Sequence, residues 1–137
     1  MKDTELKEMR DREFYRLYVR SLDDGMHFES QRKAADILKD RPAPGYFISA
    51  REASLQIGKL MCHVQDIGVS SQQRRKINDI YRRYKEYLRS HTDCAMSRIQ
   101  VLELIVDDEA PEWYMTSELA RKILRKECRR RRKELGW

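Results

Sequence analysis

The sequence predicts an all-α protein made of two related three-helix units, in tandem, that share a core. Apolar residues recur at helical spacing along most of the 137 residues, and the chain contains only five Gly and three Pro. One segment also occurs twice, because residues 30–57 align with residues 97–124 without a gap, at an offset of 67 (97 − 30). The identical positions are Ser30/Ser97, Asp40/Asp107, Ala43/Ala110, Pro44/Pro111 and Ala53/Ala120. Each half would be marginally stable alone, so we expect units 1–68 and 69–137 to pack together.

The first unit is expected to contain three helices. The first spans about residues 4–22, and the second begins near Ser30. The second must end before Pro42, because the residue before a proline avoids the helical region. A third helix begins at Ser49, which forms a capping-box pattern with Glu52. Its apolar face comprises Ala53, Ile57, Leu60, Met61 and Val64.

The second unit repeats this order. A helix is expected over residues 71–90, where tyrosines and isoleucines form an apolar stripe between many Arg and Lys. Residues 97–106 are nearly all apolar and by themselves also fit a strand, but their match to residues 30–39 favours a helix. Thr116 is expected to cap the last helix, which reaches toward Leu135.

Composition and motifs exclude several classes of protein. No apolar run approaches the roughly 18 residues of a membrane span, and the charged N-terminal segment does not resemble a secretory signal, so we expect a cytoplasmic protein without membrane association. Cys62, Cys94 and Cys128 show no metal-ligand spacing and are expected to be free thiols. The chain has no phosphate-binding glycine loop and no catalytic motif, so we expect neither enzymatic activity nor a cofactor or metal.

The positive charge is clustered. The net charge is +6, and basic residues are concentrated in residues 74–89 and 121–133. Such clusters attract polyanions, and a capped third helix with small polar and basic residues is the outline of a helix-turn-helix. The connector before that helix is longer than the usual turn. We expect DNA binding, with DNA favoured over RNA, through Arg51, Ser54, Gln56, Arg74, Arg75, Arg82, Arg83, Ser117, Arg121, Lys122, Arg125, Arg129, Arg130, Arg131 and Arg132.

The connector between the second and third helices has two interpretations. Its aromatic residues, above all Tyr46 in the first unit and Trp113 in the second, could stack on bases or enter a partner's pocket. They could instead seal the space between helices, and their equal distance from the cap in both copies favours this structural role.

The same connector carries a family resemblance. Its segment PAPGYFIS, residues 42–49, resembles a Pro-Ala-Pro-x-aromatic-aromatic-Ile/Val-Ser element of small, basic, uncharacterised bacterial and phage proteins. This resemblance implies a regulator or accessory factor of a phage or mobile element. The second copy departs from it, with Glu109 and Glu112 in place of Pro42 and Gly45.

An alternative to DNA binding is a protein–protein interaction or structural module, such as a phage assembly component. Tyrosine and arginine side chains together on residues 74–89 are the types that interface centres favour, and the partner would be an acidic protein. A homodimer is also compatible with the sequence, since helix-turn-helix proteins often bind as dimers.

Overall fold

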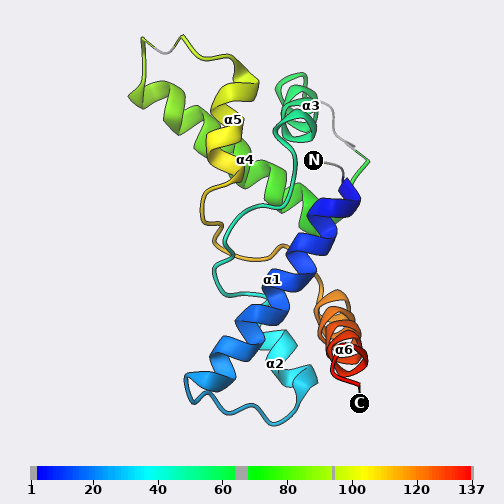
Figure 1. Cartoon of the computed structure of the whole chain (residues 1–137). Coiled ribbons are helices and arrows are strands. Elements are labelled where there is room, and N and C mark those ends of the chain that lie inside the picture. Colours follow the sequence, from blue (N-terminus) through cyan, green and yellow to red (C-terminus); the bar gives the residue numbers. More distant parts are fainter. Residues whose placement is uncertain (1–2, 64–67, 94, 137) are drawn as a thin grey trace.

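The computed structural model describes residues 3–63, 68–93 and 95–136, so the predicted core residue Val64 and the thiol of Cys94 lie outside the described residues. Within these ranges the chain forms six α-helices and no strand beyond an isolated two-residue bridge, which confirms the all-α class (Figure 1). The helices are α1 (Asp3–Asp23), α2 (Gln31–Leu38), α3 (Ala50–Met61), α4 (Ser71–Ser90), α5 (Arg98–Val106) and α6 (Ser117–Glu134). Residues 98–106 are therefore helical, as their match to the first copy predicted.

Hydroxyl side chains define where five helices begin. Each of the N-cap residues accepts a hydrogen bond from the backbone N–H three residues later; they are Ser30, Ser49, Ser70, Ser97 and Thr116. The reciprocal half of the capping box predicted at Ser49 does not form, because the carboxylate of Glu52 accepts from the Gln56 amide instead, at 2.7 Å. A complete capping box occurs at α5, where the Ser97 N–H donates to Gln100 Oε1 at 2.8 Å.

The helices pack in two groups. The first two helices of each half pack with the third helix of the other half, an arrangement called here the exchange of third helices. α1 and α2 pack with α6, whereas α4 and α5 pack with α3, and Figure 1 shows the two groups at opposite ends of the molecule. Within the described ranges α2 does not pack against α3, nor α5 against α6. The groups therefore cut across units 1–68 and 69–137. The helix-turn-helix expected within each half does not form, since its second and third helices lie in different groups.

The exchange takes place where the two connectors cross. Ala43 N–H donates to the Ala110 carbonyl at 2.9 Å, and Ala110 N–H donates back to Ala43 at 2.8 Å. The next bonds also correspond at the offset of 67: Tyr46 N–H donates to Val106 O at 3.0 Å, and Trp113 N–H donates to Lys39 O at 3.1 Å. These bonds satisfy backbone groups that would otherwise be buried without partners. The two connectors thus hold each other in matching conformations.

Four aromatic rings lock the crossing. Tyr46 stacks on Tyr114 with ring centroids 5.9 Å apart, and Phe47 stacks on Trp113 at 5.6 Å. Phe47 and Tyr114 both have φ of 53°, a left-handed conformation that costs a bulky residue of the order of 1 kcal/mol or more and persists only where packing enforces it. The rings are buried or half-buried between the helix groups. This confirms the structural interpretation of the aromatic connector.

The buried side chains form one continuous cluster through both groups. Phe14, Leu38 and Leu124 fill the group of α1, α2 and α6, and Phe14 meets the Trp113 ring edge-on at 5.1 Å. Ile57 and Leu102 are buried in the other group, together with Ile77 and Ile80. The aromatic connectors join the two halves of this cluster, so the core is shared as the sequence predicted.

Candidate nucleic-acid interface

The outer face of α6 carries a stripe of basic side chains. The inner face of the helix buries Ala120, Ile123, Leu124 and Glu127 against the core. Spacings of three and four residues then place a second set on the opposite face, where every member is exposed and forms no ion pair with any described residue. This set, named here the outer stripe, is Lys122, Arg125, Arg129 and Arg132. Four unpaired cations on one helical face create a local positive potential.

A hollow of about 420 Å³ separates the outer stripe from the start of α2. Arg32 of α2 and Arg121 and Arg125 of α6 line it, with Gln31 and Glu118. Arg121 is fixed there by a bidentate pair with Asp36, at 2.9 and 2.5 Å. The Arg121 hydrogen bonds lower the pKa of the Asp36 carboxyl. Arg121 is thus oriented by Asp36 and partly neutralised, while Arg32 and Arg125 are exposed beside it.

Three further basic residues of α6 interact with the protein itself, and Lys133 is the one basic residue of this helix outside the outer stripe with no ion-pair partner among the described residues. Lys126 donates to the buried carboxylate of Asp11 in α1. Arg130 and Arg131 lie 3.8 and 3.6 Å from carboxylate oxygens of Glu134, and Arg131 also lies over the Tyr15 ring at 5.7 Å. These ion pairs partly neutralise Lys126, Arg130 and Arg131, so the outer stripe and Arg32 are the cations best placed to bind a ligand.

Three of the arginines of α4 have acidic neighbours. Arg75 pairs with Glu112 at 2.7 Å, and Arg82 lies within 4.0 Å of carboxylates one turn away on either side, at Asp79 and Glu86. Arg83 pairs with Asp108 at 3.6 Å and also lies over the Tyr46 ring. Arg74 is half-buried. The sequence grouped these residues with those of α6, but α4 and α6 belong to different helix groups and do not pack together.

The predicted residues of α3 do not form one reading surface. Arg51 is exposed and Ser54 is half-buried. Gln56 is 6% exposed, and its amide donates to Glu52. The structure therefore corrects the prediction that Gln56 reads a base, because its side chain faces the protein interior. Ser117, at the start of α6, is half-buried beside Asp36.

Sequence reasoning missed Arg32. Its position two residues after the Ser30 cap is evident from the sequence. Its proximity to Arg125, however, depends on the exchange of third helices that brings α6 to α2. Local sequence carries no signal for that exchange.

Other kinds of site find no support in the described ranges. No group of three or more His, Cys, Asp or Glu residues there could hold a metal ion. None of the helices in those ranges combines the length and apolar content that a bilayer crossing requires. No protein-family model, curated protein or solved structure matches the chain.

Proposed function

We propose that this protein is a non-enzymatic DNA-binding protein that tracks the phosphate backbone with the outer stripe of α6 and with Arg32. The observation that carries the proposal is the contrast between two basic helices. Arg75, Arg82 and Arg83 of α4 have carboxylate neighbours, whereas the outer stripe has no ion-pair partner among the described residues. Unpaired cations release condensed counterions when they bind phosphates, and this release supplies most non-specific affinity.

The row of cations along α6 suits a DNA duplex better than a small ligand that binds in a pocket. The outer stripe covers residues 122–132 along one face of α6, so its side chains can meet successive phosphates. The hollow lined by Arg32, Arg121 and Arg125 lies at the side of this face and offers a position for one further phosphate. A role as a regulator or accessory factor of a phage or mobile element rests on the PAPGYFIS resemblance.

The test is fluorescence anisotropy with a labelled DNA duplex over a range of salt concentrations. Replacing Arg125, Arg129 and Arg132 by Ala should weaken binding to all sequences and reduce the slope of log K against log salt by about 3, since each lost phosphate contact contributes roughly 0.9. The matched control replaces Arg75, Arg82 and Arg83 by Ala, which removes the same charge. The control should retain nearly the original slope. Equal losses in both variants, or no binding at low salt, would contradict the proposal.

The alternative, a protein-interaction module, is favoured by one feature of the opposite helix group. Leu55 and Met61 of α3 and Ile99 and Leu104 of α5 are large apolar side chains that are 41–57% exposed on two helices that pack together. Such residues favour contact with another protein surface. Sedimentation of the wild-type protein and of Leu55→Ser/Leu104→Ser separates these functions: self-association that the variant loses would support an interface, and a monomer with salt-dependent DNA binding would support the first proposal.

A further inference from the structure

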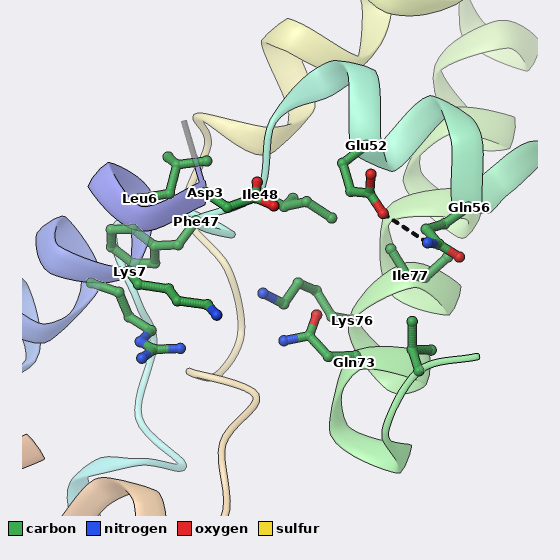
Figure 2. Close-up of a pocket in the computed structure, with 12 residues that line it drawn as sticks. Asp3, Leu6, Lys7, Phe47, Ile48, Glu52, Gln56, Gln73, Lys76 and Ile77 are labelled. Atoms are coloured by element: carbon green, nitrogen blue, oxygen red, sulfur yellow. Dashed lines mark hydrogen bonds between the residues drawn. The ribbon is translucent and has the colours of Figure 1, made fainter. Parts of the chain in front are cut away.

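A second cationic site lies between the two helix groups. The N-terminal end of α1 extends past its own group to the beginning of α4 (Figure 1). There, α1, α3, α4 and the first connector enclose a hollow of about 280 Å³ (Figure 2). It contains none of the residues assigned above to DNA binding. Gln56, which the sequence alone placed in that set, lines the hollow with its amide bonded to Glu52.

Lys76 is the central feature of this hollow. Its side chain is 5% exposed, and its ammonium donates to the Tyr46 carbonyl at 3.0 Å. An ammonium has three N–H donors, and the other two have no acceptor among the described residues. Burial, and secondarily the charge of Arg10, lower the pKa of Lys76 to about 8. Lys76 is therefore a buried cation with unused hydrogen-bonding capacity.

Other donors converge on the same space from the neighbouring elements. Lys7 of α1 and Lys76 of α4 extend toward one another across the hollow, and the Gln73 amide lies on the Lys76 side (Figure 2). Arg10 completes the set from α1, where its guanidinium also pairs with Asp11 at 3.0 Å. Like charges that face each other without an anion repel, and a bound anion removes that repulsion.

The acidic residues of the lining do not neutralise these lysines. Glu52 bonds to Gln56, and Asp3 is exposed at the end of α1. Neither carboxylate forms an ion pair with Lys7 or Lys76 in the described structure. Lys7, Arg10 and Lys76 outnumber Asp3 and Glu52 among the charged residues that line the hollow, so the net charge of its lining is positive.

We propose that this hollow binds the phosphate group of a small molecule, held by Lys7, Lys76 and the Gln73 amide. A volume of about 280 Å³ is just under the roughly 300–1,000 Å³ of common ligand pockets, so it suits a compact phosphate compound and is too small for a duplex. The ligand would connect α1 of one group with α4 of the other. Binding would also raise the pKa of Lys76, because an opposite charge favours the protonated ammonium.

The test is a titration with inorganic phosphate at near-neutral pH, followed by the side-chain amide signal of Gln73 in NMR spectra. We expect a saturable shift in the millimolar range or below. Lys76→Met should abolish it, and Lys7→Met, which changes an exposed side chain and does not threaten the fold, should weaken the affinity at least several-fold. Lys122→Met removes the same charge from the outer stripe and should leave the titration unchanged.

Two further titrations identify the source of the anion and keep this proposal separate from DNA binding. Acetate should shift the Gln73 signal weakly or not at all, and a DNA duplex should leave it in place. A shift that persists in Lys76→Met, no saturable shift with phosphate, or a shift caused by the duplex alone would overturn the proposal. The anisotropy experiment above does not depend on Lys7 or Lys76, so either proposal can fail without the other.

Discussion

Replacing the buried Lys76 by Met should stabilise the protein, and the gain should shrink as the pH rises. Met has similar length, leaves no charge in the interior and fills the same space along the stem of the lysine. The reason lies in proton binding. The folded protein holds the pKa of Lys76 at about 8, against 10.5 for a free lysine, so the unfolded chain binds the proton more tightly.

The magnitude follows from this difference. At neutral pH both states are protonated, and the lowered pKa corresponds to a penalty of about 3 kcal/mol on the folded state. Losing the hydrogen bond to the Tyr46 carbonyl costs the variant about 1 kcal/mol. The net gain of Lys76→Met is therefore about 2 kcal/mol. Between pH 8 and 10.5 only the unfolded state remains protonated, so the penalty falls as the pH rises, and at about pH 9.5 the two proteins should be nearly equal in stability.

The assay is urea unfolding of the wild-type and variant proteins, in parallel, at about pH 7 and about pH 9.5. The difference between the two proteins at each pH is the informative quantity, because the tyrosines and cysteines titrate in both and cancel. A difference that stays constant over this range would refute the argument, since it would show that the Lys76 ammonium is not penalised by burial. A variant less stable than the wild type at neutral pH would do the same.

Three further changes test the packing. Tyr114→Phe removes the hydroxyl that donates to Asp79 and should cost about 2 kcal/mol in urea unfolding; a loss below about 0.5 kcal/mol would mean that this bond contributes nothing. Ala110→Leu crowds the buried connector bridge and should cost about 1–3 kcal/mol, measured as a lower thermal midpoint, while the same change at exposed Ala95 should be neutral. Ser97→Ala removes the capping box of α5 and should cost about 1 kcal/mol, an effect that an unchanged urea midpoint would rule out.

The local structure was predictable because helix signals are local. Ser30, Ser49 and Thr116 cap helices where the sequence placed them, and the apolar segment 98–106 is a helix as its match to the first copy indicated. Caps and periodicity depend on neighbours within one turn, so they survive any tertiary arrangement. The outcome for Glu52 differs, because the side chain of Gln56 on the next turn competes for its carboxylate.

The exchange of third helices was not predictable for a reason that the duplication itself supplies. The two copies have the same apolar pattern, so the first two helices of each half can find a suitable third helix in either half. Local pattern cannot choose between them, and the choice depends on a connector whose bonds run to its counterpart 67 residues away (110 − 43). The candidate interface inherits this limit, because Asp36, which fixes Arg121, and Arg32 are near α6 only after the exchange.

The crossed connectors also constrain how the chain can reach its native state. α1 and α2 acquire their third partner only when α6 arrives, about a hundred residues later, and α3 requires α4 and α5, which follow it. Contacts between such distant segments form slowly, because a long loop must close before they gain any stability. Synthesis of the first half alone therefore completes neither helix group. The group of α3, α4 and α5 can assemble earlier, whereas the group of α1 and α2 should complete its folding only when the last helix arrives.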